Sequence, residues 1–159
     1  MFYPWYKKKT LNHEIMKATE LRTKRIEFLK DTINHYNLQN RSQSPLGNGC
    51  YYSAAHENTQ GCAIGRHIQD KDLCLKLDSM GGISFKIFNL LPNKLQELSI
   101  DFLARVQQLH DRNVNWIIKG LSKRGEIIVN DIITEFKLNV TVDDLLMYKD
   151  QNSTLQKME

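Results

Sequence analysis

The feature that most constrains the fold is the segment 12–36, which contains neither proline nor glycine. Within it, Ile26, Leu29, Ile33 and Tyr36 recur at spacings of three and four residues. That period places apolar side chains on one face of a helix. The segment therefore predicts a long amphipathic helix near the start of the chain.

Further helices are predicted in the second half of the chain. Asp70 or Asp72 can cap a short helix that runs to Leu77. Pro92 suits the first turn of a helix, where a missing N–H costs nothing, and an apolar stripe extends from there to His110. We expect one continuous long helix over 92–110.

The C-terminal third has the same character. Trp116, Ile117 and Leu121 continue an apolar face until Gly125, and the segment 128–136 predicts another helix despite its β-branched residues. Thr141 is an expected N-cap, because two aspartates follow it in what would be the first turn of a short helix.

A short hairpin is expected between the first two helices. The runs CYYSA at 50–54 and GCAIG at 61–65 are compatible with strands and are separated by AHENTQ. In that register Cys50 and Cys62 could face each other. The fold class predicted is α+β and mostly helical, with several helices packed around a short β-hairpin.

Length and composition favour one folded domain. A chain of 159 residues with 41% hydrophobic and 25% charged residues has the composition of an ordinary globular domain. We expect an aromatic and basic arm at 1–10, a single α+β domain at 11–148 and a polar tail at 149–159. Phe2, Tyr3, Trp5 and Tyr6 of the arm stand beside three consecutive lysines.

The same composition bears on the compartment. No apolar run approaches the length of a membrane span, and three cysteines are too few for a disulfide scaffold. We therefore expect a cytoplasmic protein with free thiols and no membrane partner. The formal net charge of +4 would help association with an acidic partner.

Four short segments carry a resemblance: NRS at 40–42, CYY at 50–52, GCAIGRHI at 61–68 and LHD at 109–111. Together they resemble a group of small uncharacterised bacteriophage and prophage proteins. In that group a helix precedes an Arg-Ser, a Cys-x-Tyr and a Gly-Cys-Ala-Ile-Gly hairpin, and a later helix ends in His-Asp. The resemblance implies a viral protein acting in an infected bacterium, but it brings no biochemical function.

Two kinds of chemistry are conceivable. Cys62 could be a nucleophile with His110 as base and Asp111 as orienting group, although a cysteine between small residues is commonly a buried apolar group. His110 also has an electrostatic explanation, because the last turn of a helix favours a cation. Zinc ligand types occur at four positions, but their spacing of five or six residues is unlike the tight pairs of structural zinc sites; these positions are Cys50, His56, Cys62 and His67. We expect no metal and no cofactor.

Binding is the better supported role. Aromatic residues are enriched at protein interfaces, and Trp5 and Tyr6 on a short arm need a surface to cover them. Tyr51, Tyr52 and Arg66 are the other candidate binding residues. The leading hypothesis is a phage-type accessory protein that binds a host or viral protein without catalysis, and self-association is also possible.

Two alternatives stay open. The first is a cysteine-dependent enzyme that uses Cys62 with His110. The second is a nucleic-acid-binding module based on basic residues of the N-terminal third, although acidic residues lie among them; the basic set is Lys7, Lys8, Lys9, Arg22, Lys24, Arg25 and Arg41.

Overall fold

The structure, a computed structural model, describes residues 4–41, 51–53 and 61–147, and it describes side chains within the first range from residue 14 onward. The predicted class is confirmed: the fold is α+β and mostly helical, with one small two-stranded sheet in the described ranges. The elements are α1 Pro4–His35, η1 Gly65–His67, α2 Lys71–Asp78, α3 Phe85–Phe88, α4 Asn93–Gln96, α5 Ile100–Asp111, η2 Asn113–Asn115, β1 Trp116–Ile117, β2 Gly120–Leu121, α6 Lys123–Glu135 and α7 Val142–Leu145.

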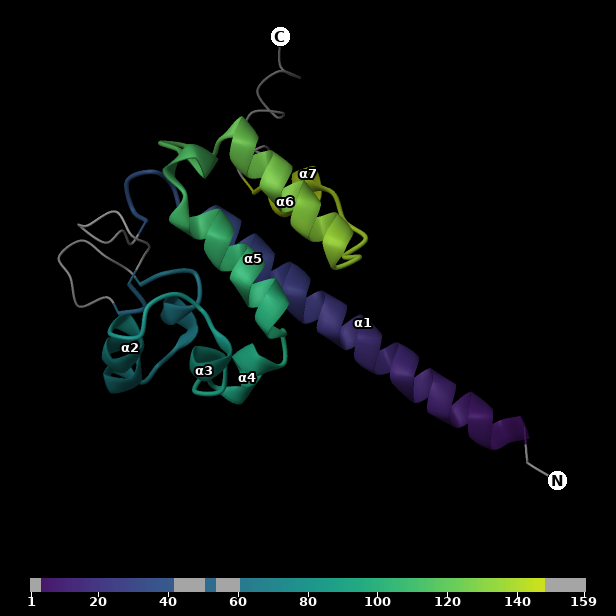
Figure 1. The fold of residues 1–159 in the computed structure, drawn as a ribbon. Helices are drawn as coiled ribbons and strands as arrows, with labels where there is room; N and C mark the ends of the chain where they lie inside the picture. The colour runs from purple at the N-terminus through teal and green to yellow at the C-terminus, as the bar shows by residue number, and fades with distance from the viewer. Residues whose placement is uncertain (1–3, 42–50, 54–60, 148–159) are drawn as a thin grey trace, which may run out of the picture.

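Three helices form the centre of the fold. The C-terminal half of α1 packs against α5, α5 packs against α6, and α7 contacts both α1 and α6 (Figure 1). The short helices α3 and α4 lie near the N-terminal end of α5, with α2 to the side of α3, and the sheet lies at the other end of α5 (Figure 1). The helices α1, α5 and α6 contribute fully buried side chains to the core, among them Leu29, Phe102, Leu103 and Ile132.

The first long helix starts earlier than expected. It begins at Pro4, so residues 4–10 of the predicted arm belong to its first turns. Proline is tolerated in the first turn of a helix, and no proline or glycine interrupts the 31 residues that follow it within α1. The predicted tail at 149–159 lies outside the described residues.

The expected helix over 92–110 is wrong, because it breaks into α4 and α5 at Ser99. Ser99 has a φ of 76°, a left-handed backbone conformation that a continuous helix cannot contain. Arg25 of α1 holds this turn: its Nε donates to the carbonyl oxygen of Leu98 (3.1 Å) and its Nη2 donates to Ser99 Oγ (2.9 Å). A contact from a distant helix thus stabilises this turn, together with the N-cap that Ser99 forms by accepting a hydrogen bond from the N–H of Phe102.

Replacing Arg25 by alanine should therefore destabilise the protein by about 1–3 kcal/mol, because it removes two hydrogen bonds from a charged donor. It also removes a cation that lies 5.0 Å from the ring centroid of Phe136. Urea unfolding of Arg25→Ala beside Arg25→Lys measures the effect. If Arg25→Lys were as stable as the unchanged protein, the paired hydrogen bonds of the Arg25 guanidinium would contribute nothing to the free energy of unfolding.

The small sheet is not where the sequence placed it. Residues 51–53 and 61–65 contain no strand, although the N–H of Cys62 donates to the carbonyl oxygen of Tyr51 (2.7 Å). The strands are instead β1 and β2, in a stretch for which the sequence predicted only an apolar face, and they pair antiparallel with Trp116 opposite Leu121. Gly120 has a φ of 126°, which lets the chain reverse there.

Several predicted helix starts are confirmed. Asp70 caps α2, where its side chain accepts a hydrogen bond from the N–H of Leu73 (3.0 Å). Thr141 and Asp144 form a reciprocal capping box at α7. In the described part of the chain, no helix combines the length and the apolar character needed to cross a membrane.

Candidate functional site

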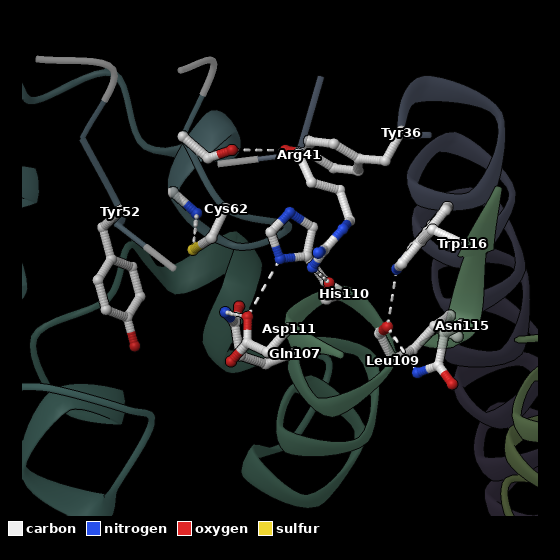
Figure 2. A network of polar contacts seen from close by, with 12 residues as sticks. Tyr36, Arg41, Tyr52, Cys62, Gln107, Leu109, His110, Asp111, Asn115 and Trp116 are labelled. Carbon is white, nitrogen blue, oxygen red and sulfur yellow. Dashed lines mark hydrogen bonds and ion pairs between the residues drawn. The ribbon is translucent and has the colours of Figure 1, made fainter. Parts of the chain in front are cut away.

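The segments that carried the resemblance meet in space. Arg41, Tyr52, Cys62, His110 and Asp111 come from four places along the chain and lie in one polar cluster beside the C-terminal end of α5 (Figure 2). Of these five residues, the sequence analysis had grouped only Cys62, His110 and Asp111 in one candidate site. Whether the cluster reacts or only holds the fold depends on its burial and on its protonation states.

Arg41 joins the loop after α1 to the end of α5. Its side chain is buried, and its guanidinium donates to the carbonyl oxygen of His110 and to Asn113 Oδ1. A cation placed on the last carbonyls of a helix stabilises that terminus. Arg41 is thus a structural residue, and its predicted place in a basic binding surface is wrong.

His110 is fully buried rather than exposed at a helix end. Its Nδ1 lies 3.1 Å from Asp111 Oδ1, and its ring packs edge-on against Tyr36 with centroids 4.4 Å apart. Burial lowers the pKa of His110, since a charged imidazole would lose its hydration there. The expected stabilising cation at this position is therefore wrong: the imidazole is neutral near pH 7.

Cys62 lies close to His110 and Asp111, as the enzyme hypothesis required (Figure 2). Its side chain is fully buried, however, and burial raises the pKa of the thiol to about 12. The N–H of Gly65, 3.4 Å from Sγ, opposes this rise only in part. A nucleophilic cysteine needs a lowered pKa and access to substrate, and this geometry supplies neither.

Tyr52 is buried as well. Its N–H donates to Asp78 Oδ1 (2.5 Å), the hydroxyl of Ser53 donates to the same carboxylate, and burial raises the pKa of the Tyr52 phenol. The prediction of Tyr52 as a binding residue is therefore wrong, because its side chain is not exposed. Tyr51 beside it is half-buried.

Arg66 and His67 of η1 both lie against Asp31 of α1, and Arg66 forms the ion pair. Arg66 Nη2 lies 2.9 Å from Asp31 Oδ2, and His67 Nε2 lies 3.2 Å from the same oxygen. Burial, and next the charge of Arg66, lower the pKa of His67 to about 4. Asp31 was not among the sequence candidates, because an isolated acid on an amphipathic helix gives no sign of its partners.

The predicted metal ligands are only partly described. Cys50 and His56 lie outside the described residues, while Cys62 and His67 belong to different contacts. Among the described side chains, no group of three or more histidine, cysteine or acidic residues is placed to hold a metal ion.

The buried histidines make stability depend on pH. The folded-state pKa of His110 and of His67 lies below the ordinary value of 6.5, so below about pH 6.5 the unfolded chain binds protons that the folded protein does not. The free energy of unfolding should fall as the pH drops from 6.5 toward 4. Urea titrations at several pH values should show a shallower fall in His110→Gln, and an equal fall in both proteins would contradict this assignment.

A second feature lies at the other end of α1. The N-terminal half of this helix extends beyond the rest of the fold (Figure 1), and every residue from 14 to 20 is exposed. Ile15 and Met16 are 55% and 70% exposed. Trp5 and Tyr6 fall in the first turns of α1, and their side chains lie outside the described part.

Sequence reasoning missed Ile15 as a candidate binding residue. A signal was present, because Ile15 lies at helical spacing from the apolar positions that begin at Ile26. Comparison with known proteins adds no relative: no protein family, no curated protein and no solved structure matches this chain.

Proposed function

We propose that this chain is a non-enzymatic accessory protein of the phage type that acts by binding another protein, of the host or of the virus. The contact surface is the projecting part of α1, which we define as residues 4–20. On this proposal the protein works in the cytoplasm of an infected bacterium.

The observation that carries the proposal is the exposure of residues 14–20 within the projecting part. At about 1.5 Å per residue it extends roughly 25 Å, and the described portion of the fold places no element against it (Figure 1). A helix of this length without tertiary contacts is marginally stable in water. A partner that covers Ile15 and its neighbours would stabilise the helix and bury their apolar surface.

The polar cluster supports a role without catalysis. Cys62 and His110 are fully buried, and the pKa shifts of the thiol and the imidazole leave both groups neutral near pH 7. Their contacts instead connect α5 to the loop after α1 and to η1. The cysteine-enzyme hypothesis groups residues that lie together, but the Cys62 thiol lacks the lowered pKa and the access to substrate that catalysis needs.

The nucleic-acid hypothesis is weakened by the contacts of its basic residues. Lys24 is held by Glu20 and Glu97, each 2.7 Å away. Arg25 and Arg41 donate their hydrogen bonds to the protein itself. Of the seven basic residues in that set, three thus have partners within the protein itself, which leaves less charge for a phosphate backbone.

Site-specific photo-crosslinking in the native host tests the proposal. A photoreactive amino acid replaces Met16 on the projecting part or, as the control, Val114 on η2, which is similarly exposed at 66%. We expect one discrete protein adduct from position 16 that resists nuclease and is absent from position 114. Adducts at both positions, or at neither, would overturn the proposal.

A further inference from the structure

We infer that the partner of the projecting part of α1 presents a groove with an apolar floor and an acidic rim, which receives this part of the chain as a helix. The inference rests on the proposed function and adds the chemistry of the partner. Two features of α1, an apolar stripe and an excess of positive charge, carry it.

The stripe begins on the face of α1 that packs against the fold. Leu29 and Ile33 on that face are buried. Steps of three and four residues toward the N-terminus lead from them through Ile26, Arg22, Ala18, Ile15 and Leu11. Residues at these spacings share one helix face. The apolar face therefore continues past the last contact with the fold, and Ile15 on it is 55% exposed.

Arg22 is the polar member of this stripe. The long apolar stem of an arginine can lie along an apolar surface while its guanidinium reaches solvent or an acid. An acidic rim would accept that charge. Met16, although more exposed than Ile15, lies about 100° around the helix from it and so falls off the stripe.

The net positive charge of the chain is concentrated in α1. This helix contains eight lysines and arginines and four acidic residues, so its formal net charge of +4 equals that of the entire chain. The projecting part alone carries four lysines and two glutamates. One of these, Glu20, is paired with Lys24 of the packed half, 2.7 Å away. The remaining excess of positive charge calls for an acidic surface opposite.

These two features together select one class of partner. A second copy of the chain would place one positively charged helix against another, which is unfavourable. A nucleic acid would satisfy the lysines but would leave Ile15 and the stripe uncovered. A protein groove that accepts an amphipathic helix covers the stripe and meets the lysines at its rim.

The test uses the full-length chain and the protein that crosslinks at position 16. Its affinity is measured by calorimetry at several salt concentrations. Ile15→Gln removes an apolar side chain on the stripe, and Met16→Gln makes the same change beside it. A triple variant with Lys7→Gln, Lys8→Gln and Lys9→Gln removes charge from the projecting part, with Lys71→Gln, Lys76→Gln and Lys86→Gln as its control on α2 and α3. Circular dichroism confirms that each variant folds.

We expect Ile15→Gln to weaken binding about tenfold or more and Met16→Gln to change it by less than about threefold, because only Ile15 would be buried in the groove. The Lys7, Lys8, Lys9 triple should weaken binding and flatten its salt dependence, while the control triple should do neither.

Several results would overturn the inference. Equal effects of Ile15→Gln and Met16→Gln would exclude the stripe, and an unchanged salt dependence in the Lys7, Lys8, Lys9 triple would exclude the acidic rim. A self-adduct from position 16, with dimers in sedimentation of the purified chain, would identify a second copy instead. If position 16 captures no protein, the proposed function itself fails, and this outcome is distinct from the others.

Discussion

Gly65→Ala is expected to lower the free energy of unfolding by more than about 3 kcal/mol, one of the two largest effects predicted for a single substitution in this protein. A Cβ at this position would lie 2.0 Å from the carbonyl oxygen of Tyr52 and 2.5 Å from its Cα. Both are backbone atoms, so no side chain can rotate away to make room. Relief would require η1 to separate from residues 51–53, which would open the polar cluster around Cys62.

Urea unfolding of Gly65→Ala measures this effect, and Gly82→Ala is the matched control. No atom lies within 4 Å of a Cβ built on Gly82, and its φ is not in the left-handed region. The control should therefore change stability by less than about 1 kcal/mol. If the two variants were equally stable, the close approach of Gly65 to Tyr52 would be excluded.

Gly125→Ala is expected to destabilise the protein by more than about 2 kcal/mol, although alanine is the better helix former by about 1 kcal/mol. Gly125 lies in the first turn of α6, where an added Cβ would be 2.2 Å from the carbonyl oxygen of Asn115 and 2.8 Å from Leu121 Cδ2. The leucine can move, but the carbonyl belongs to η2. That segment is held because Asn115 Nδ2 donates to the carbonyl oxygen of Leu109 (2.9 Å).

Thermal unfolding by calorimetry measures the second effect, because the loss should appear as a lower melting temperature with the helix content retained. A Gly125→Ala variant that melts higher than the unchanged protein would show that helix propensity outweighs the contact. The packing of α6 on η2 would then be looser than the distances indicate.

The elements that the sequence predicts well are those fixed by local patterns. The spacing of Leu29 and Ile33 defines the packed face of α1, and Asp70 and Thr141 mark helix starts because their side chains bond to backbone N–H groups three residues on. These signals act within a few residues, so they can be read from one sequence.

The elements that the sequence misplaces depend on distant contacts. The break at Ser99 is held by Arg25, which is 74 residues away. The sheet consists of two strands of two residues each, too short for the alternation that identifies a strand. The small residues of GCAIG resemble a hairpin signal. Gly65 is needed there for a different reason, because the backbone of Tyr52 lies too close to admit a Cβ.

The candidate site shows the same division. The sequence grouped Cys62 with His110 and Asp111, and the structure brings them together (Figure 2). It could not reveal that Cys62 and His110 are fully buried, which reverses the chemistry expected of them. Conversely, helical spacing from Ile26 places Ile15 on the apolar face, but its exposure follows from where the other helices end, which no local pattern shows.

Hydrogen exchange of the backbone amides of residues 4–20, measured with and without the partner, tests the docking role of α1 most directly. In the free protein these amides should exchange far faster than those of α5, because a helix without tertiary contacts opens readily. Bound partner should slow them at least tenfold and leave α6 unchanged. Protection that appears elsewhere, with residues 4–20 still exchanging as in the free protein, would contradict the claim that this part of α1 is the docking surface.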